Sequence, residues 1–362
     1  MLTGLSAFSL QPRVQRMIPT DRQPFRIALN GYGRIGRCVL RALHERGGDG
    51  LQIVALNDLA DQASIEYLTR FDSTHGRFPG EVSVDGDCLH INGDCVKVLR
   101  EQHPEGVDWA ALGVDLLLEC SGQYTTREEA LRFAHAGVPR VLFSQPMANE
   151  QAVDATVVYG VNHQQLDASQ RLVSNASCTT NCGVPLLKLL NERVGLEYVS
   201  ITTIHSAMND QPVIDAYHHD DLRRTRSAFQ SVIPVSTGLA RGIERLLPEL
   251  AGRIQAKAIR VPTVNVSALD ITLQTARDTT AEEINELLRA AAGAEFVGLL
   301  DYTELPHASC DFNHDPHSAI VDGSQTRVSG PRMVNLLVWF DNEWGFANRM
   351  LDVAGYWLRR CG

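Results

Sequence analysis

In the first half of the chain, short apolar runs alternate with amphipathic segments. The apolar runs predict buried strands at residues 25–30, 52–58, 114–120, 140–144 and 156–161. The segments between them favour helices after residue 36 and at 65–69 and 127–135, and a polar, β-branched stretch covers 81–99. Because strands that alternate with helices imply right-handed βαβ crossovers, we expect a mostly parallel sheet.

The pattern changes after residue 178. The segments 199–207, 256–274 and 333–340 are longer and partly alternate with a period of two, which is typical of an antiparallel sheet with one covered face. Helical patterns at 239–247 and 281–292 would provide the cover, and a last helix is expected at 344–358. The sequence therefore predicts an α/β domain followed by an α+β domain with a mainly antiparallel sheet.

Length and charge narrow the possible functions. A chain of 362 residues favours two domains, and 44% hydrophobic with 21% charged residues is ordinary for a globular protein. The net charge of −10 argues against a nucleic-acid-binding protein. No apolar run approaches the roughly 20 residues that a membrane span requires. We therefore expect neither nucleic acid nor membrane as a partner, and a cytoplasmic location.

Cysteines, histidines and the N-terminal residues give weaker signals. The eight cysteines are scattered and form no CxxC pair, so we expect reduced thiols. His314 and His317 in HDPH have a spacing that also arises in ordinary loops, and we expect no metal. Residues 1–24 lack an apolar core of secretory length, so we interpret them as a disordered extension, with Met17 as an alternative start.

A glycine-rich motif follows the first predicted strand. Residues 30–36, NGYGRIG, place Gly31, Gly33 and Gly36 between a strand and a helix. Such glycines let the backbone approach a pyrophosphate, whose charge the N–H groups of the helix receive. Asp58 ends the second strand, where its carboxylate can accept both ribose hydroxyls and would repel a 2′-phosphate. Together these features predict dinucleotide binding, with NAD favoured over NADP.

The segment 174–182, SNASCTTNC, joins a strand to an apolar helix and places Cys178 at or just before the helix N-terminus. A helix N-terminus and a cationic neighbour can lower a thiol pKa from about 8.5 to about 3.5–7.5. His205 ends the strand VSITTIH, where it would pair with the thiolate and take the proton of a thiohemiacetal hydroxyl. Each residue alone is more typical of a structural role, but the pair beside a dinucleotide motif predicts aldehyde oxidation through a cysteine thioester.

Six segments resemble those of glyceraldehyde-3-phosphate dehydrogenases and occur in the same order. They are NGYGRIGR, SNASCTTNC, HSAMNDQ, DLRRTR, RVPTVNVSALD and WFDNEWGFANRMLD, and the likeness extends over residues 25–358. The resemblance implies a Rossmann-type NAD-binding domain over 25–177, completed by a C-terminal helix at 342–362. It also implies a catalytic domain over 178–341 and a homotetramer.

The resemblance also assigns roles to individual residues. Cys178 is implied as the nucleophile, His205 as its activating base, and Asn342 as the residue that fixes the nicotinamide carboxamide. The other implied NAD contacts are Gly31, Gly33, Arg34, Ile35, Gly36, Asp58 and Ser121. The implied substrate- and anion-binding residues are Ser177, Thr179, Arg224, Thr237, Gly238 and Arg260. Cys182 lies one helical turn from Cys178. This spacing is compatible with two roles for Cys182, packing within the helix or forming a disulfide with Cys178 on oxidation.

Departures from the family pattern bear on the substrate. Met208 stands where these enzymes usually carry a threonine that binds the substrate phosphate, and a thioether donates no hydrogen bond. Met208, YHHDDLRRTR and residues 312–330 resemble a branch that oxidises D-erythrose 4-phosphate to 4-phospho-D-erythronate, with water releasing the thioester. That product feeds the synthesis of pyridoxal 5′-phosphate, so the expected partner is a phosphorylated aldose.

Two alternatives stay open. Thr237-Gly238 follows the phosphorylating enzymes, whereas the erythrose branch resembles Thr-Lys there, so release by inorganic phosphate in a glycolytic glyceraldehyde-3-phosphate dehydrogenase is the first alternative. A non-catalytic NAD-sensing or RNA-binding protein on the same fold is the second. The acidic charge and the presence of Cys178 and His205 argue against it.

Overall fold

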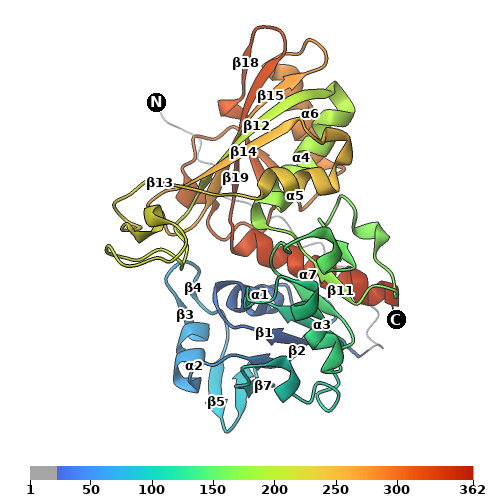
Figure 1. Ribbon diagram of the computed structural model, residues 1–362, viewed down its shortest axis with the longest axis vertical. Coiled ribbons are helices and arrows are strands. Elements are labelled where there is room, and N and C mark those ends of the chain that lie inside the picture. The colour runs from blue at the N-terminus through green and yellow to red at the C-terminus, as the bar shows by residue number, and fades with distance from the viewer. Residues whose placement is uncertain (1–22, 362) are drawn as a thin grey trace, which may run out of the picture.

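A computed structural model describes residues 23–361. The expected disordered extension at 1–24 therefore lies, except for its last two residues, outside the described part of the chain. Two sheets form the centres of the two halves of the molecule, with the N-terminal half below and the C-terminal half above in Figure 1. The predicted fold class, a Rossmann-like α/β half and a half with a mainly antiparallel sheet, is confirmed.

The N-terminal sheet has nine strands in the order β10-β11-β9-β8-β1-β2-β7-β6-β5. The pairs from β10 to β7 are parallel, and β5, β6 and β7 form antiparallel hairpins at one edge. The strands are β1 (Phe25–Asn30), β2 (Leu51–Asn57), β5 (Val82–Asp85), β6 (Cys88–Ile91), β7 (Asp94–Leu99), β8 (Leu116–Glu119), β9 (Val141–Phe143), β10 (Ala155–Thr156) and β11 (Leu172–Ser174). A small separate pair consists of β3 (Phe71–Asp72) and β4 (Gly76–Arg77).

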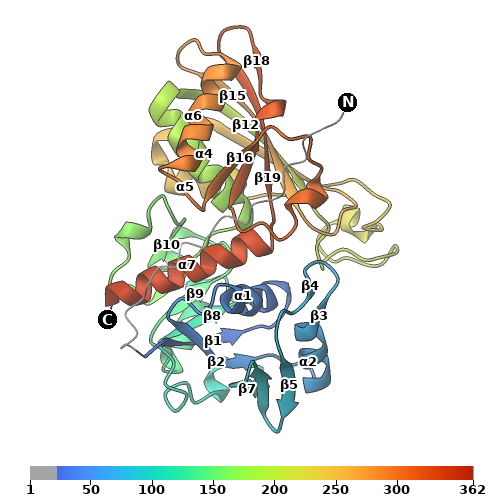
Figure 2. The same ribbon diagram turned by 180° about the vertical axis from the view of Figure 1, so that it is seen from behind.

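Helices cover this sheet, and one of them comes from the end of the chain. They are α1 (Arg34–Glu45), α2 (Gln62–Arg70), α3 (Arg127–His135) and α7 (Trp344–Cys361). Leu40 of α1 and Trp357 of α7 are fully buried in the same apolar core. Figure 2 shows α7 running alongside α1, between the two sheets. The last segment of the chain therefore belongs to the core of the first sheet.

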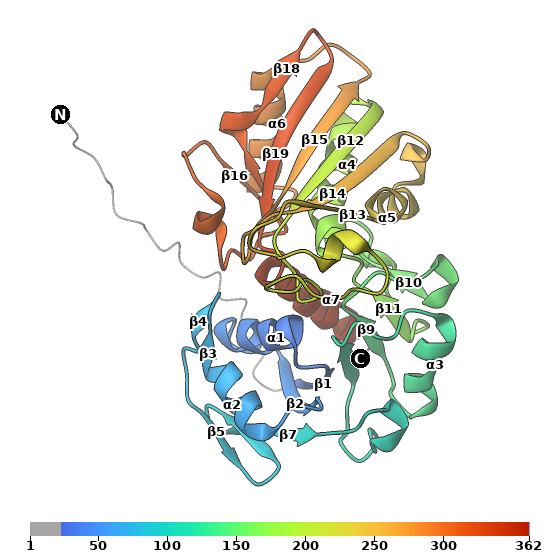
Figure 3. The same ribbon diagram turned by 60° about the vertical axis from the view of Figure 1, so that its left-hand side comes forward.

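The C-terminal sheet has the order β13-β14-β12-β15-β19-β17-β16, with β18 paired to β19. Its strands are β12 (Leu196–His205), β13 (Ile233–Val235), β14 (Ile254–Arg260), β15 (Ser267–Thr275), β16 (Leu300–Thr303), β17 (Ala319–Asp322), β18 (Arg327–Ser329) and β19 (Met333–Phe340). The helices α4 (Cys178–Val194), α5 (Leu239–Leu246) and α6 (Ala281–Gly293) lie on one side of it, as Figure 3 shows. Alternate residues of β15 are buried, as a half-covered sheet requires.

Short 3-10 turns complete the described secondary structure. They cover Pro104–Gly106, Glu150–Ala152, His163–Gln165, Leu222–Thr225, Pro248–Leu250, Ser309–Phe312 and Gly323–Gln325. Among the described residues, no helix combines the length and the apolar character that crossing a membrane requires.

Two strand predictions need correction. The predicted strand at 156–161 is wrong beyond Thr156, because the chain turns there and Val161 N donates to Val158 O. The segment 256–274 is divided between β14 and β15, since Pro262 lacks an N–H and interrupts the ladder. In addition, β14 is parallel to β12.

The expectation of reduced thiols is also wrong for one pair. Cys88 and Cys95 form a disulfide between the neighbouring strands β6 and β7, with Cα atoms 5.3 Å apart. The tight hairpin at Asn92-Gly93 brings them together. Spacing alone does not reveal this, because cysteines seven residues apart meet only when the chain reverses between them.

Candidate active site

The glycine motif forms the turn between β1 and α1. Gly31 has φ +90°, and a Cβ there would lie 2.6 Å from the backbone N of Ser121. A Cβ on Gly36 would lie 2.2 Å from the carbonyl oxygen of Gly31. By contrast, Gly33 caps α1, and a Cβ there would meet no described atom within 4 Å outside its neighbours. Gly31 and Gly36 are thus required by packing, while Gly33 leaves open space at the helix N-terminus for a ligand.

Asp58 lies directly after β2, beside the glycine turn. Its Oδ2 accepts a hydrogen bond from Tyr32 N at 2.7 Å, and its Oδ1 accepts one from Ala60 N at 2.9 Å. A pocket opens beside this carboxylate, and its lining residues are Tyr32, Gly33, Arg37, Asp58, Ala60, Ser64, Ile65 and Leu68. Two backbone donors therefore fix the carboxylate at the wall of a pocket that begins at the N-terminus of α1, which is where a ribose next to a pyrophosphate would lie.

Ser121 lies on the other side of the glycine turn, and a buried carboxyl group holds it. Its backbone N donates to Glu119 Oε1 at 2.7 Å, and its hydroxyl donates to the same oxygen. Asn30 Nδ2 donates to Glu119 Oε2. Burial raises the pKa of Glu119 to about 7, although the donors from Ser121 and Asn30 act to lower it. The sequence analysis missed Glu119, because a glutamate ending an apolar strand shows no sign of these partners.

Arg34 and Ile35 begin α1, but their side chains point into the protein. The Arg34 guanidinium forms ion pairs with Asp72 and Glu343, and its Nε donates to Glu343 Oε1 at 2.8 Å. Ile35 packs against the core of the N-terminal half. At these two positions, a dinucleotide would therefore meet the backbone N–H groups at the start of α1, because the Arg34 guanidinium is already paired with Asp72 and Glu343.

Cys178 is the first residue of α4, as predicted. Ser177 caps the helix, with its hydroxyl accepting from Thr180 N at 3.1 Å and contacting the Thr179 hydroxyl at 2.9 Å. Ala176, which precedes them, has φ +56°, a conformation that costs a non-glycine residue of the order of 1 kcal/mol. This sharp turn places Cys178 against the cores of both halves.

His205 ends β12 and faces the cysteine. Its Nε2 lies 3.8 Å from Cys178 Sγ, and its Nδ1 lies 2.8 Å from the carbonyl oxygen of Ser206. Because a carbonyl oxygen accepts only, Nδ1 carries the proton and Nε2 presents a lone pair to the thiol. The pair therefore has the geometry of a nucleophile and its base.

Burial opposes the lowering of the cysteine pKa that the helix N-terminus favours. Burial raises the pKa of Cys178 to about 12, against the lowering effect of nearby backbone N–H groups, and Asp341 and Glu343 raise it further. Burial also lowers the pKa of His205. Burial thus favours the uncharged forms of both groups, while the 3.8 Å contact leaves His205 Nε2 in position to accept the thiol proton.

Asn342 lies next to this pair through a chain of hydrogen bonds. Its Oδ1 accepts from the hydroxyls of Ser206 at 3.0 Å and Ser267 at 2.8 Å. Ser206 follows His205 directly and donates to Asn342, so the positions of His205 and the Asn342 amide are linked through Ser206. Since both serines occupy Oδ1, the amide offers Nδ2 as a donor to a ligand. The sequence did not point to either serine.

The two arginines expected to bind an anion, Arg224 and Arg260, converge on a residue that the sequence analysis did not assign. Asp210 accepts from Arg260 Nη1 at 2.5 Å and from Arg224 Nη1 at 3.1 Å. Arg260 Nη2 lies 3.6 Å from Met208 Sδ, and Met208 is 47% exposed. Asp210 belongs to the HSAMNDQ segment, but only the fold shows that it bridges two arginines 36 residues apart.

Thr237 and Gly238 lie at the N-terminus of α5. Gly238 is its N-cap, and Thr237 Oγ1 accepts from Leu239 N at 3.2 Å. Helix α5 packs beside α4, where a Cβ on Gly242 would lie 3.3 Å from Thr180 Oγ1 in the first turn of α4. The N-termini of two neighbouring helices therefore face the region of Cys178, and both favour an anion.

Cys182 is fully buried inside α4, one turn from Cys178. Burial raises the pKa of its thiol well above the ordinary value. Within the described structure Cys182 has the surroundings of a packing residue.

Comparison with protein-family models supports the same division into two functional parts. The model described as the NAD binding domain of glyceraldehyde 3-phosphate dehydrogenase matches residues 25–127, and the model described as the C-terminal domain of that enzyme matches residues 177–342. The chain belongs to this family through both of its domains. It therefore has the domains of an NAD-dependent dehydrogenase, and its cofactor is NAD.

Family membership fits the geometry of the dinucleotide site. The glycine turn, the fixed Asp58 carboxylate and its pocket lie within the matched NAD binding domain. Cys178, His205 and Asn342 lie within the match to the C-terminal domain. The family match does not distinguish between aldehyde substrates. The residues that bear on this distinction are Met208, Arg224 and Arg260, where the substrate phosphate is expected.

Proposed function

We propose that this chain oxidises D-erythrose 4-phosphate to 4-phospho-D-erythronate with NAD, as an erythrose-4-phosphate dehydrogenase. The observation that carries the proposal is the contact between Met208 and Arg260 at the anion site. The thioether of Met208 donates no hydrogen bond to a phosphate. The donors at this site are therefore placed differently from those of family members that carry threonine at the position of Met208. A substrate one carbon longer carries its phosphate farther from the aldehyde carbon, which is compatible with that difference.

The Cys178–His205 pair would form the thioester. As Sγ bonds to the aldehyde carbon, the thiol proton moves to His205 Nε2, which lies 3.8 Å away, and is passed on to the new oxyanion. The resulting thiohemiacetal hydroxyl then returns its proton to Nε2 as hydride leaves the same carbon. The backbone N–H groups at the start of α4 would stabilise the oxyanion, because they point out of the helix end.

The residues at the cofactor site would hold NAD in an extended form. Asp58 would accept the ribose hydroxyls, the start of α1 would receive the pyrophosphate, and Asn342 Nδ2 would donate to the carboxamide. When bound, NAD supplies the hydride acceptor. Because the two serines fix the Asn342 amide, they would select which face of the ring meets the substrate.

Release of the acid would use water. Water attacks the thioester carbon, the carbon–sulfur bond breaks, and the Cys178 thiol is regenerated with the proton that His205 held. The acid leaves as its carboxylate, and the two protons of the water pass to solvent. A second candidate, the phosphorylating glyceraldehyde-3-phosphate dehydrogenase, is favoured by Thr237 and Gly238 at the start of α5, since this helix end would hold inorganic phosphate.

A rate comparison tests the proposal. NADH formation is measured with erythrose 4-phosphate and with glyceraldehyde 3-phosphate, each with and without inorganic phosphate. We expect kcat/KM at least about 10-fold higher for the four-carbon substrate, a difference of about 1.4 kcal/mol in transition-state stabilisation, and no dependence on phosphate. Preference for the three-carbon substrate with a strict phosphate requirement would instead establish the second candidate.

Two variants sharpen this comparison. Cys178→Ser should bind NAD with parental affinity but form no NADH, whereas a non-catalytic NAD-sensing or RNA-binding protein would form none in the parent either. Met208→Thr should raise the use of glyceraldehyde 3-phosphate relative to erythrose 4-phosphate, because it adds a phosphate donor next to Arg260. An unchanged ratio would remove Met208 from the argument.

Related proposals follow from the family resemblance. We propose domain boundaries at 25–177 and 178–341, a homotetrameric assembly, a cytoplasmic location and a role in supplying pyridoxal 5′-phosphate synthesis.

A further inference from the structure

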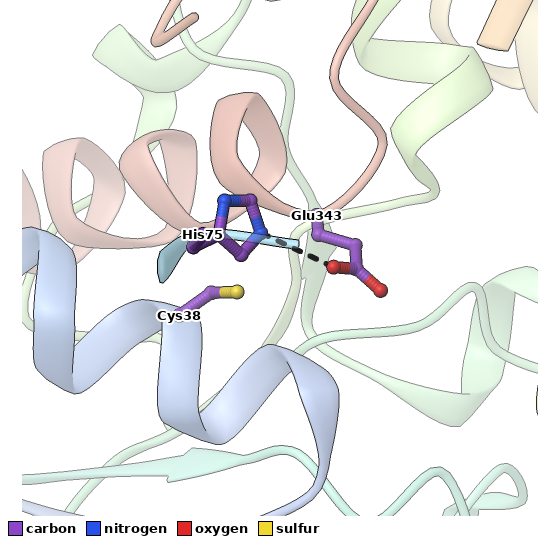
Figure 4. Close-up of side chains that lie close together, drawn as sticks. All are labelled: Cys38, His75 and Glu343. Atoms are coloured by element: carbon purple, nitrogen blue, oxygen red, sulfur yellow. Dashed lines mark hydrogen bonds and ion pairs between the residues drawn. The ribbon is translucent and has the colours of Figure 1, made fainter. Parts of the chain in front are cut away.

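Three side chains with metal-binding chemistry, none of them part of the Cys178–His205 pair, meet in the interior. Cys38 comes from α1, His75 from the turn between β3 and β4, and Glu343 from the residue before α7. Figure 4 shows the three groups facing a common centre. Cys38 and the side chain of His75 are fully buried, and the side chain of Glu343 is 13% exposed. A thiol, an imidazole and a carboxylate from three separate elements therefore converge in a nearly closed space.

The His75 ring has a partner on its other side. His75 Nδ1 lies 3.1 Å from His314 Nδ1, and His314 Nε2 lies 2.9 Å from Glu45 Oε2. His314 is also stacked on Trp344, with ring centroids 3.6 Å apart. A histidine that binds a metal through one nitrogen normally donates from the other to a fixed acceptor. His314, held by Glu45 and Trp344, is such an acceptor for His75.

The hydrogen bonds of this chain need one hydrogen more than two neutral imidazoles carry, and Glu343 Oε2 also accepts from Arg34. The contacts Glu343–His75, His75–His314 and His314–Glu45 each need one hydrogen between the two heavy atoms. Two neutral imidazoles supply two hydrogens. If these serve the two contacts of His314, then His75 Nε2 and Glu343 Oε2 face each other at 3.2 Å as two acceptors. A cation between them, or one additional proton, is needed to balance the contact.

The surrounding charge favours a cation. Carboxylates at Glu343, Asp72 and Asp341 lie close enough to act on the Cys38 thiol, and Arg34 is the cation among the groups that act on it. Arg34 is already shared between Asp72 and Glu343. Asp341 accepts from backbone N–H groups and from Asn265 rather than from a cation. The cluster thus holds more negative than positive charge in a buried place, where a divalent ion would be strongly stabilised.

The separations suit a small tetrahedral ion. Two ligand bonds of about 2.0–2.1 Å at a tetrahedral angle place a nitrogen and an oxygen about 3.3 Å apart, close to the 3.2 Å between His75 Nε2 and Glu343 Oε2. The three ligand atoms all lie within 4.8 Å of one another, and a tetrahedral site needs about 3.6 Å between sulfur and either partner, so each of these separations has to shorten by at most about 1.2 Å. Thiolate, imidazole and carboxylate are together the ligand types of zinc.

We propose that Cys38, His75 and Glu343 form a binding site for a divalent transition-metal ion of the zinc type, with His314 and Glu45 as the supporting pair that orients His75. On binding, a metal–sulfur bond replaces the S–H bond of Cys38 and the proton passes to solvent, with no change of oxidation state. The ion would tie α1 and the β3–β4 turn to the start of α7. It would thereby stabilise the positions of Arg34 and Asn342, which flank Glu343 in space and in sequence.

The test titrates full-length protein with Co²⁺, which replaces zinc in such sites and absorbs in the near ultraviolet when bonded to a thiolate. Cys178→Ser protein is used, so that the Cys178–His205 pair contributes no signal. We expect one Co²⁺ per chain with the thiolate band, displacement of the band by Zn²⁺, and a higher melting temperature with Zn²⁺ than without metal.

Further substitutions assign the ligands. Cys38→Ser should abolish the thiolate band, and His75→Gln should weaken Co²⁺ binding by at least about 10-fold. Cys310→Ser, which changes an exposed free cysteine, and His90→Gln, on the β6 hairpin, serve as matched controls and should leave the band unchanged. NAD binding and far-ultraviolet circular dichroism report whether each variant is folded.

Several outcomes would overturn the assignment. They are the absence of a thiolate band in the folded parent background, an equal band in Cys38→Ser, or affinity unaffected by His75→Gln. If Cys38→Ser does not fold, the parent titration and the His75 variant still decide the question.

Discussion

At the scale of single residues, burial has a larger effect on the candidate site than local sequence does. Cys178 lies at a helix N-terminus next to a histidine, which by itself favours a low thiol pKa. Burial nevertheless raises that pKa to about 12 and lowers the pKa of His205. Both effects of burial oppose the charged thiolate–imidazolium pair that the helix N-terminus favours.

Glu119 offers a test of burial at the dinucleotide site. Burial raises its pKa from 4.5 to about 7. A raised carboxyl pKa means that folding favours the protonated form, so its contribution to stability is complete below about pH 4.5 and is lost as the pH rises through 7. By linkage the loss is on the order of 3 kcal/mol. The free energy of unfolding of the parent, minus that of Glu119→Gln, should therefore fall between pH 4.5 and 8.

A control separates this effect from general titration. Glu128→Gln removes an exposed carboxyl on α3 and should give a difference from the parent that changes little over the same pH range. The difference in the free energy of unfolding between the parent and Glu119→Gln could prove equally independent of pH. The pKa of Glu119 would then lie near its ordinary value, with the donors from Ser121 and Asn30 offsetting burial.

At the scale of elements, the turn from β1 to α1 contains two glycines that packing requires, Gly31 and Gly36, and one, Gly33, beside open space at the helix N-terminus. Gly36→Ala would place its Cβ 2.2 Å from Gly31 O, and Gly31 itself lies against Ser121. Since backbone on both sides must move, we expect a loss of at least about 1–3 kcal/mol in the free energy of unfolding and weakened NAD binding. Thermal unfolding and an NAD titration measure the two effects.

Gly33→Ala is the matched variant. Its φ of −71° is ordinary for alanine, and a Cβ there would meet no described atom within 4 Å beyond its neighbours. We expect parental stability with NAD affinity reduced at least about 10-fold, because the Cβ would occupy the space that a pyrophosphate approaches. Parental NAD affinity in this variant would show that the turn does not make close contact with the cofactor.

At the scale of the whole molecule, α7 joins the two halves. It follows β19 of the C-terminal sheet, yet its residues pack into the core of the N-terminal half beside α1. Trp357 is fully buried there, and its Nε1 donates to Asp167 O at 3.0 Å. Because Asn342 and Glu343 immediately precede this helix, loosening α7 would disturb the hydrogen bonds of Asn342 with Ser206 and Ser267 as well as the core.

Trp357→Ala tests this coupling. We expect a loss of about 3–5 kcal/mol in the free energy of unfolding, from the cavity left in the shared core, together with weaker NAD binding. Tyr198→Ala, which removes a 64% exposed aromatic ring on β12, is the control and should change stability by at most about 0.5 kcal/mol. Hydrogen exchange resolves the two halves, and unaltered protection throughout the N-terminal half of Trp357→Ala would contradict the coupling.

Much of this protein was predictable from continuous stretches of sequence. A few neighbouring residues are enough to encode the alternation of strands and helices and the glycine turn. The same holds for the positions of Asp58 after β2, Cys178 at the start of α4 and His205 at the end of β12. Period, capping and turn chemistry act over that same short range, so they can be inferred before the fold is known. The interruption at Pro262 and the turn after Thr156 were misjudged, since short apolar runs do not distinguish strands from buried turns.

The tertiary structure alone decided which distant residues meet. Four groupings depend on how separate elements pack. They are Asp210 with Arg224 and Arg260, the two serines with Asn342, the Cys88–Cys95 disulfide, and the cluster of Cys38, His75 and Glu343. Cys38 and Glu343 are 305 residues apart, and no local pattern relates them. Burial is likewise a property of the packed molecule, and it raises the pKa of Cys178, whereas the helix N-terminus that the sequence predicts would lower it.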